Sequence, residues 1–252
     1  NLEAALPSKS LNQLYQGMAQ SQMAVKRGIQ VIDMIMDQVH EKPIDAATFV
    51  YLDARQITQK ALDEYGYEAE TERNRVSFIT TGSFYFHIDE TLYLFVLFNL
   101  LKNSLYYLSA YPNARIELRL ETTATGNRVY VRDTGPGIAA AQLPHLFDSF
   151  YTQGKKGGTG LGLAYCQRVM HAFDGAISCD SVEGEFTEFT LTFPVVNDQQ
   201  LADYHTSILT HAVADFRGKR VLVVDDDRLY QNQVKQSYGM VELERNLIDQ
   251  LL

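Results

Sequence analysis

The chain has 252 residues, 46% of them hydrophobic, and a formal net charge of −9 at pH 7. That length allows one or two domains with a sizeable hydrophobic core. The acidic balance argues against nucleic acid as the main partner, because attraction to phosphate backbones requires an excess of lysine and arginine.

The sequence shows no recognisable membrane span or secretion signal. Its longest apolar run, 92–98, is much too short to cross a bilayer, and the first residues include neither a methionine nor a basic segment. Cys166 and Cys179 lack the spacing of a metal or redox motif, which indicates ordinary reduced thiols. We therefore expect this chain to be a cytoplasmic part of a longer protein.

Residues 9–40 have the pattern of one long helix, which Pro43 prevents from continuing. Apolar side chains recur at steps of three and four and form a narrow seam. Such a seam, with no partner helix nearby in the sequence, favours a coiled-coil or bundle interface and hence a homodimer. Packing against the chain's own domain is the alternative. The seam consists of Leu11, Leu14, Met18, Val25, Ile29, Ile32, Met36 and Val39.

Residues 44–194 alternate between strand and helix patterns. Asp89 is the expected cap of the longest helix, and 125–127 and 183–184 are expected hairpin turns. Helices flanking a mixed, largely antiparallel sheet predict a two-layer α/β sandwich. The expected strands are 49–52, 75–79, 83–87, 115–122, 128–133, 176–181 and 186–193, and the expected helices are 54–65, 89–110 and 164–173, the last of which Gly175 terminates.

The segment 157–163, Gly-Gly-Thr-Gly-Leu-Gly-Leu, runs directly into that last helix. Glycines let the backbone approach a ligand closely, and a helix N-terminus offers unpaired N–H groups, so the pattern predicts a phosphate site. No Gly-Lys-Ser/Thr follows as in a Walker loop, and no apolar strand leads in as in a dinucleotide fold. A glycine-rich turn that only packs the helix on the sheet is the alternative.

Polar residues at the ends of other elements point to the same kind of ligand. Asn99 and Asn103 are four apart on an otherwise apolar helix, and an amide oxygen is a neutral ligand suited to Mg²⁺ beside phosphates. Asp133 ends an alternating strand, where its carboxylate at the sheet edge can accept a hydrogen bond from the amine of adenine. Gly135 and Gly137 keep the adjoining wall free of side chains. A satisfied core amide and a plain turn are the structural alternatives.

Between these segments lies a stretch with the composition of a lid. Phe147 and Phe150 are expected to anchor a flexible loop to the body of the domain. The polar residues after them include Lys155 and Lys156, which can reach phosphate or simply be solvated.

Four segments, taken in this order, resemble the motif boxes of sensor histidine kinases. Residues 99–104 resemble the N box, 133–138 the G1 box, 146–150 the F box and 158–163 the G2 box, and their order and spacing agree over 44–194. The resemblance implies a protein histidine kinase with the ATP-binding sandwich of the GHKL superfamily, which gyrase, Hsp90 and MutL share. The F box favours the kinase branch of that superfamily.

The same resemblance assigns roles with ATP and Mg²⁺ as cofactors. Asn103 would coordinate Mg²⁺, Asn99 would support the phosphates and Asp133 would bind the adenine amine. Tyr107 would pack beside adenine. The remaining nucleotide contacts would come from Gly135, Gly137, Phe147, Phe150, Gly158, Thr159, Gly160, Leu161 and Gly162.

One position departs from the family pattern. Tyr106 stands where many members carry a lysine or arginine that contacts phosphate. Lys102, Lys155 or Lys156 is expected to take that role.

The two ends of the chain are read through the same family. Residues 1–43 look like the second helix of the dimerisation and phosphotransfer hairpin, and 195–216 look like a linker helix. Residues 217–252 resemble the start of a receiver domain, in which Asp225 and Asp226 follow a buried strand as a candidate Mg²⁺ pair.

The phosphoacceptor histidine is expected outside this chain. His40 is followed by Glu41, but Pro43 comes too early for the acceptor box. The chain is therefore expected to bind ATP without phosphorylating itself. Receiver or phosphotransfer domains of a phosphorelay are the expected partners.

A narrower resemblance rests on 97–107, which looks most like the vibrio-type α-hydroxyketone quorum-sensing kinases. It implies a hybrid kinase whose parent is anchored in the bacterial inner membrane through a part not present here. Two functions of other classes remain open, a GHKL ATPase clamp and a non-catalytic dimerisation scaffold. A clamp ATPase would need an acidic residue on the long helix to activate water, and neither Asn99 nor Lys102 is acidic.

Overall fold

The computed structural model describes residues 44–108, 110–123, 125–152 and 159–216. The described part falls into two units, one ending at Val196 and the other beginning at Asn197. The helix expected over 9–40, the lysines of the expected lid and the expected receiver strand with Asp225 and Asp226 lie outside the described residues.

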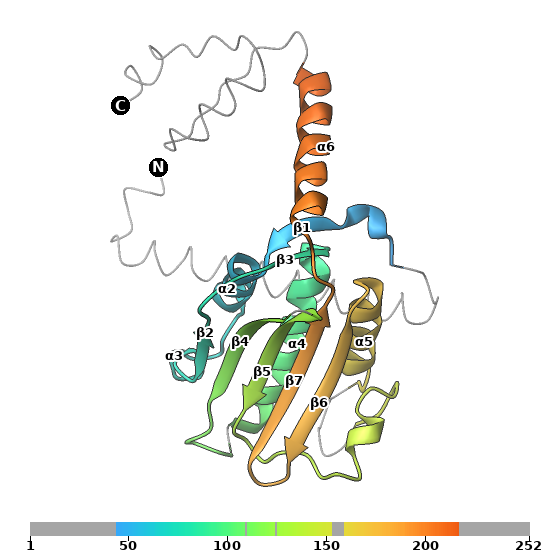
Figure 1. The fold of residues 1–252 in the computed structure, drawn as a ribbon. Coiled ribbons are helices and arrows are strands. Elements are labelled where there is room, and N and C mark those ends of the chain that lie inside the picture. Colours follow the sequence, from blue (N-terminus) through green and yellow to red (C-terminus); the bar gives the residue numbers. More distant parts are fainter. Residues whose placement is uncertain (1–43, 109, 124, 153–158, 217–252) are drawn as a thin grey trace, which may run out of the picture. The chain divides into compact units, whose positions relative to one another are not determined.

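A five-stranded sheet forms the first unit's framework (Figure 1). Its strand order is β2-β4-β5-β7-β6, with β2 parallel to β4 and every other pair antiparallel. The prediction of a mixed, largely antiparallel sheet is therefore confirmed. The strands are β2 (Val76–Ile79), β4 (Ile116–Thr123), β5 (Gly126–Asp133), β6 (Ala176–Val182) and β7 (Phe186–Phe193).

A second, two-stranded antiparallel sheet pairs β1 (Val50–Asp53) with β3 (Tyr85–Ile88). The sequence patterns predicted both strands but not their pairing. The first unit also contains three short helical turns, which are η2 (Ala46–Thr48), α3 (Glu70–Arg73) and η3 (Leu143–His145).

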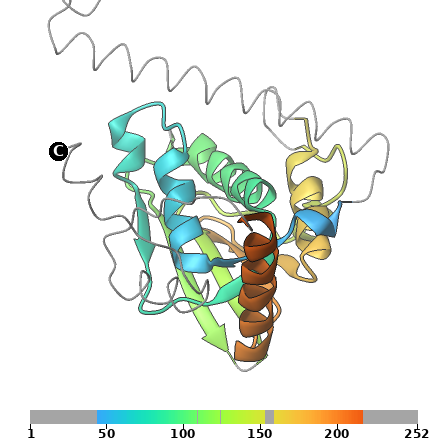
Figure 2. The same cartoon turned by 90° about the horizontal axis from the view of Figure 1, so that it is seen from above.

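Three helices cover one face of the five-stranded sheet, and Figure 2 shows them side by side above it. They are α2 (Ala54–Glu64), α4 (Glu90–Leu108) and α5 (Gly162–Ala172), with α4 packed between the other two. The carboxylate of Asp53 caps α2 by accepting from Gln56 N at 2.8 Å. Asp89 accepts from Leu92 N at 3.0 Å at the start of α4, as the sequence predicted.

The core lies between these helices and the inward face of the sheet. Alternation along β4, β5 and β7 turns every second side chain toward α4, so one face of each strand is apolar. A cluster of edge-to-face rings, Phe86, Tyr93 and Phe193, closes one end of this layer, with centroids 4.9–6.1 Å apart. The buried strand residues facing the helices are Ile116, Leu118, Val129, Val131, Ile177, Phe189, Leu191 and Phe193.

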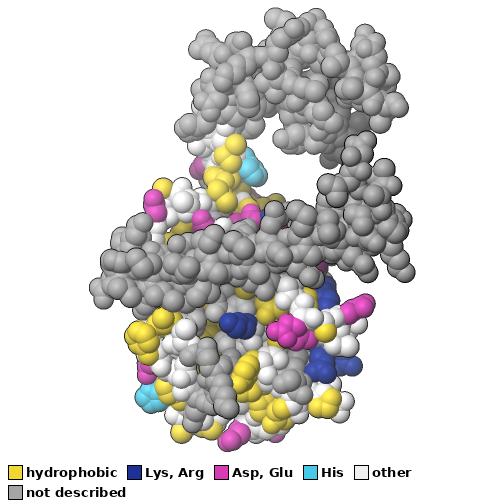
Figure 3. Space-filling model, turned by 180° about the vertical axis from the view of Figure 1, so that it is seen from behind, with side chains coloured by type: hydrophobic (Ala, Val, Ile, Leu, Met, Phe, Trp, Pro, Cys, Tyr) yellow, Lys and Arg dark blue, Asp and Glu magenta, His cyan; other side chains and the backbone are white. Residues whose placement is uncertain are grey.

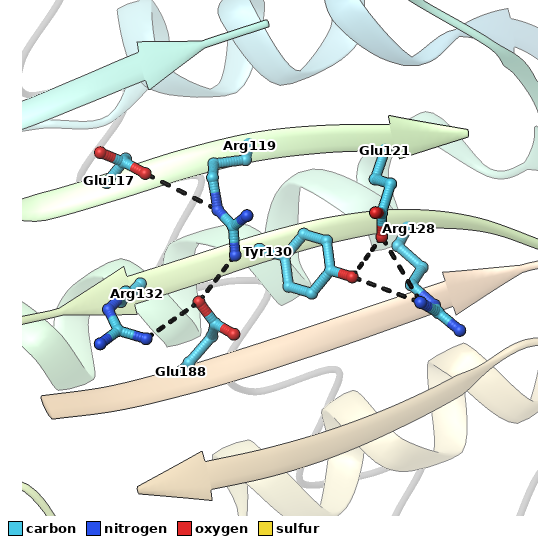
Figure 4. Close-up of polar contacts among 7 residues, drawn as sticks. All are labelled: Glu117, Arg119, Glu121, Arg128, Tyr130, Arg132 and Glu188. Carbon is cyan, nitrogen blue, oxygen red and sulfur yellow. Dashed lines mark hydrogen bonds and ion pairs between the residues drawn. The ribbon is translucent and has the colours of Figure 1, made fainter. Parts of the chain in front are cut away.

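In the described part of the first unit, the opposite face of the sheet carries charged side chains and no second helical layer (Figure 4). Glu188 on β7 accepts from Arg119 at 2.9 Å and from Arg132 at 3.5 Å. Arg119 also stacks over Tyr130, and Arg132 lies 3.7 Å from the ring centroid of Phe186. The guanidinium groups cover the aromatic rings and their charges are paired with Glu188. This face is therefore polar, and its aromatic rings are partly covered.

One local prediction needs correction. The turn expected at 125–127 is shorter, since Gly126 and Asn127 already pair with β4. Helix α5 ends at Ala172, within one residue of the expected end, and Asp174 after it takes the left-handed conformation with φ 54°. Gly175 follows as the expected terminator: its N–H donates to the carbonyl oxygen of Met170 at 2.9 Å, and a Cβ there would lie 2.3 Å from the carbonyl oxygen of Thr192.

The second unit is described by helix α6 (Asp198–Phe216) alone. Asn197 and Gln200 cap it reciprocally, since Gln200 N donates to Asn197 Oδ1 at 2.8 Å and Asn197 N donates to Gln200 Oε1 at 2.9 Å. A helix is thus present within the expected range 195–216, and the capping pair explains why it starts at Asp198.

The face in Figure 3 is mixed in character where grey atoms do not cover it. Acidic and basic side chains lie near one another there, and hydrophobic side chains are also exposed. Within the described ranges, no helix combines the length and hydropathy that crossing a bilayer requires.

A buried hydroxyl pair inside the helical layer gives a stability prediction. Thr58 Oγ1 and Tyr93 OH lie 2.7 Å apart, and both residues are fully buried. We expect Tyr93→Phe to cost about 1–3 kcal/mol, because Thr58 keeps a buried polar group without its partner. Adding Thr58→Val should cost less than the two single changes summed. Urea unfolding followed by circular dichroism measures this. The control is Tyr85→Phe, an exposed tyrosine on β3, and an equal loss there would contradict the expectation.

Candidate functional site

A cavity of about 540 Å³ opens between α4, the end of β5 and the start of α5. Its size is that of pockets that hold small-molecule ligands. Residues from separate parts of the chain line it, and many of them were named from the sequence. The lining residues used below are Asn99, Lys102, Asn103, Ser104, Tyr106, Tyr107, Asp133, Gly137, Thr159, Gly160, Gly162, Glu183 and Thr187.

Helix α4 presents two amides to the cavity, one turn apart. Asn99 Nδ2 donates to the carbonyl oxygen of Phe95 at 2.9 Å, which fixes the orientation of its amide. Its Oδ1 points at the first residue of α5, because a Cβ on Gly162 would lie 2.6 Å from that oxygen. Asn103 lies on the same face and lines the cavity. The glycine therefore lets the start of α5 approach the amides.

Asp133 is the buried acid of the cavity, with 6% of its surface exposed. It is the last residue of β5, the central strand of the sheet, as the sequence pattern predicted for the end of a strand beside the pocket. Its Oδ2 accepts from Ser104 Oγ at 2.8 Å, and its Oδ1 accepts from Gly135 N at 3.0 Å. Burial raises the pKa of this carboxyl, while the two hydrogen bonds and the nearby Arg132 oppose that shift.

The loop after Asp133 is seated on the β6–β7 hairpin. Gly184 N donates to the carbonyl oxygen of Pro136 at 2.6 Å, and Ile138 N donates to Ser181 Oγ at 2.8 Å. Gly137 between them has φ 66°, and a Cβ there would lie 2.1 Å from Val182 O. This part of the cavity wall therefore has to be formed by backbone, because position 137 has no room for a side chain.

The glycine-rich segment meets the loop of Phe150. Phe150 N donates to Gly160 O at 3.0 Å, and a Cβ on Gly160 would lie 2.4 Å from the Phe150 carbonyl carbon. Both residues have positive φ, 66° and 68° respectively. The sequence predicted that the Phe150 ring anchors the loop, and this prediction is wrong, because the side chain is 71% exposed. Phe147 does pack against the core.

Helix α5 begins immediately after this contact. Among the side chains that the structure describes, none caps its N-terminus. Leu161 just before it is buried in the core, so the helix start is held in place at the cavity. An uncapped N-terminus carries partial positive charge and suits an anion.

The aromatic pair Tyr106 and Tyr107, near the end of α4, also lines the cavity. Their rings meet edge to face, with centroids 5.0 Å apart, and both are partly exposed. Burial, with Tyr106 and Asp133 nearby, raises the pKa of the Tyr107 phenol, so this group stays neutral. Lys102 also lines the cavity, whereas Gly158, Lys155 and Lys156 lie outside the described residues.

The structure adds site residues that the motifs did not name. Ser104 was passed over as part of the N-box string, although it contacts Asp133 directly. Thr187 is buried and lies directly opposite Asp133 in the β5–β7 register. Glu183, assigned only to a turn, reaches the cavity from the hairpin. Only strand pairing brings Thr187 and Glu183 to the site, so local sequence gave no signal for them.

A metal at this site would depend on ligand phosphates. Among the described residues, no group of three or more histidine, cysteine, aspartate or glutamate side chains is placed to hold an ion. The amide oxygens of α4 beside an anion-binding helix start do fit Mg²⁺ carried by a polyphosphate, because Mg²⁺ is usually held by few protein oxygens plus phosphates.

Comparisons with known proteins agree with this geometry. Residues 88–197 match the family described as histidine kinase-, DNA gyrase B-, and HSP90-like ATPase. The chain is 40% identical over 182 residues to the autoinducer 1 sensor kinase/phosphatase LuxN of Vibrio campbellii, a match covering 72% of this chain and 21% of LuxN. It is 31% identical over 239 residues to the CAI-1 autoinducer sensor kinase/phosphatase CqsS of Vibrio cholerae, covering 95% of this chain and 34% of CqsS.

Solved structures give the same answer for the fold. The catalytic domain of the histidine kinase ThkA superposes with a TM-score of 0.50 at 25% identity, over 58% of this chain and 95% of that domain. The predicted two-layer α/β sandwich of the GHKL type is confirmed. The chain spans about a fifth and a third, respectively, of the two curated relatives named above.

Proposed function

We propose that the cavity binds ATP with Mg²⁺ and that the chain is the catalytic part of a sensor histidine kinase, because residues 88–197 match the family described as histidine kinase-, DNA gyrase B-, and HSP90-like ATPase. The γ-phosphoryl group of ATP is transferred to a histidine outside this chain. The observation that carries the proposal is that one cavity joins a buried carboxylate to two amides and an uncapped helix start.

The base end of the cavity is built around Asp133. An ionised carboxylate accepts hydrogen bonds only, and the exocyclic amine of adenine is a donor. Two of the lone-pair positions of Asp133 are taken by Ser104 and Gly135, which leaves acceptor capacity for the base. Tyr107 and the bare wall at Gly137 give flat, apolar surface on which a purine can lie.

The phosphate end is built from α4 and α5. Asn103 supplies an amide oxygen to Mg²⁺, and Asn99 orients beside the start of α5. The N–H groups there, with Lys102 nearby in the cavity lining, bind phosphate oxygens. Mg²⁺ supplies charge that neutralises the phosphates as the phosphoryl group leaves. The residues of the chain contribute positioning, which is most of the catalysis in phosphoryl transfer.

The wider assignment follows the relatives. LuxN and CqsS are named as autoinducer sensor kinases/phosphatases. We propose that this chain serves a quorum-sensing hybrid kinase of the same type, with phosphorelay receiver or phosphotransfer domains as partners, a homodimer through residues 1–43, and the domain boundaries predicted from the sequence.

A nucleotide titration tests the binding step. We expect a non-hydrolysable ATP analogue to bind only weakly without Mg²⁺, and Asn103→Ala to weaken Mg²⁺-dependent binding about tenfold, the equivalent of one lost polar contact. Isothermal titration calorimetry measures both effects. Asn74→Ala, an exposed amide on the α3–β2 connection, is the matched control. Unchanged affinity in Asn103→Ala would remove this residue from the Mg²⁺ site.

The reaction itself separates the remaining functions. Incubation with γ-labelled ATP should leave no acid-labile label on this chain, and adding a domain that carries the phosphoacceptor helix should restore labelling of that domain. Steady release of free phosphate instead would favour the ATPase clamp. Failure to bind any nucleotide would favour the scaffold.

A further inference from the structure

A buried serine on α4 is bonded to the acid of the base pocket. Ser104 is 3% exposed, and its hydroxyl hydrogen can be donated to a single acceptor. In a helix interior a serine commonly donates back to a carbonyl one turn earlier. Here it donates to Asp133 Oδ2 at 2.8 Å, across the gap between α4 and β5.

We propose that Ser104 is a positioning residue that holds Asp133 as an oriented hydrogen-bond acceptor and thereby makes the pocket select adenine over guanine. The proposal rests on the proposed function, in which Asp133 accepts the exocyclic amine of adenine. It adds a residue and a mechanism for base selectivity to that function.

The chemistry of selection follows from protonation. Adenine presents an amine donor at its position 6, and guanine presents a carbonyl acceptor there. An ionised Asp133 accepts from adenine and repels the guanine oxygen, whereas a protonated Asp133 can donate to guanine. A donor fixed on Oδ2 favours the ionised form, so Ser104 keeps the pocket in its adenine-selective state.

The other groups around Asp133 do not replace this contact. Arg132, on the same strand, favours the ionised form of the carboxyl, but the guanidinium group is engaged with Glu188 on the opposite face of the sheet. Burial, with a smaller contribution from the Asp133 carboxylate, raises the pKa of Tyr107 on α4 and of Cys179 on β6, so both are neutral neighbours. From β7, the residue opposite Asp133 is an uncharged threonine.

Burial sets the direction of the pH dependence. It raises the pKa of Asp133, and the Ser104 hydroxyl opposes that shift. Removing the hydroxyl therefore moves the pKa further up. ATP binding needs the ionised carboxylate. As the pH is lowered, the ATP affinity of a variant without the Ser104 hydroxyl should therefore begin to fall at a higher pH than that of the wild type.

The first arm of the test needs no nucleotide. Carbon-detected NMR follows the Asp133 carboxyl through a pH titration of the wild type, Ser104→Ala and the control Ser77→Ala, whose hydroxyl donates to a backbone carbonyl on β4. We expect an upward shift in Ser104→Ala only. An unshifted carboxyl in Ser104→Ala would overturn the proposal and leave the proposed function standing.

The second arm measures selectivity with non-hydrolysable ATP and GTP analogues and Mg²⁺. In Ser104→Ala the ratio of ATP to GTP affinity should fall about tenfold at the acidic end of a range from about pH 5.5 to 8.5, with Ser77→Ala unchanged. Ser104→Thr, which restores the hydroxyl, should recover the wild-type ratio. If Ser104→Ala does not fold, Ser104→Cys replaces it, because cysteine is closest in size to serine and is a weaker donor. Its ratio of ATP to GTP affinity should lie between the wild-type ratio and the ratio expected for Ser104→Ala.

The two arms separate the two ideas. A shifted carboxyl with an unchanged ATP to GTP ratio would overturn both the selectivity proposal and the placing of adenine at Asp133. A ratio that falls equally in Ser77→Ala would show that a general loosening of the fold, and not Ser104, alters selectivity.

Discussion

Asp133→Asn is expected to weaken ATP binding about tenfold or more while leaving the nucleotide-free fold as stable as the wild type, or more so. The loss follows because one acceptor oxygen becomes an amide donor facing the adenine amine, and a buried polar mismatch costs about 1–3 kcal/mol. Asparagine keeps the two contacts seen at Asp133, since its Oδ1 can accept from Gly135 N and its amide can donate to Ser104 Oγ.

The stability part of this expectation has a definite sign. Burial raises the pKa of the Asp133 carboxyl in the folded state, so the folded protein holds this proton more tightly than the unfolded chain. Ionised Asp133 therefore destabilises the fold fully above its folded-state pKa, and this penalty shrinks as the pH falls below that value until it is gone below the pKa of the unfolded chain. The advantage of asparagine should be largest near neutral pH and shrink on acidification.

Chemical denaturation of both proteins at neutral and acidic pH, combined with calorimetric titration of ATP, measures the two effects separately. Asp148→Asn, an exposed carboxylate beside His145, is a matched control for the loss of one negative charge. If Asp133→Asn binds ATP as the wild type does, adenine does not lie at Asp133. If the stability difference grows on acidification, burial does not dominate the pKa of this group.

The sequence predicted the elements better than it predicted their neighbours. Alternating apolar residues predicted β4, β5 and β7, and the expected cap Asp89 predicted the start of α4, because both signals are local. The strand order and the β1–β3 pairing are contacts between distant segments, and no local pattern encodes them. The turn at 125–127 was placed too late because strand pairing took in Gly126 and Asn127.

The residues of the candidate site also differ in whether local sequence reveals them. Asn99, Asn103, Asp133 and the glycines stand out because their residue types are unusual for the elements that carry them. Ser104 does not stand out, since a serine in a helix has many explanations until its partner is seen. Thr187 reaches the site only through its register opposite Asp133. A site built at the ends of several elements is therefore only partly visible in one sequence.

Gly137→Ala is expected to be the most damaging glycine substitution in the wall of the pocket. The residue has φ 66°, a conformation that costs an alanine about 1–2 kcal/mol. Its Cβ would also lie 2.1 Å from Val182 O and 2.9 Å from Glu183 Cα, and both are backbone atoms. The loop can move away only by giving up hydrogen bonds to the hairpin, such as Gly184 N to Pro136 O.

Strain and lost contacts together should destabilise the first unit by roughly 3 kcal/mol or more, which lowers its melting temperature by about 6–12 °C. Gly184→Ala is the matched control, because its φ of 85° is also positive but no atom lies within 4 Å of the added Cβ. It should lose only the conformational part, about 1–2 kcal/mol. Thermal unfolding by circular dichroism compares the two, and equal losses would mean that the hairpin yields to the added methyl. With the wall displaced, ATP should also raise the melting temperature of Gly137→Ala less than that of Gly184→Ala, since stabilisation by a ligand depends on its affinity for the folded state.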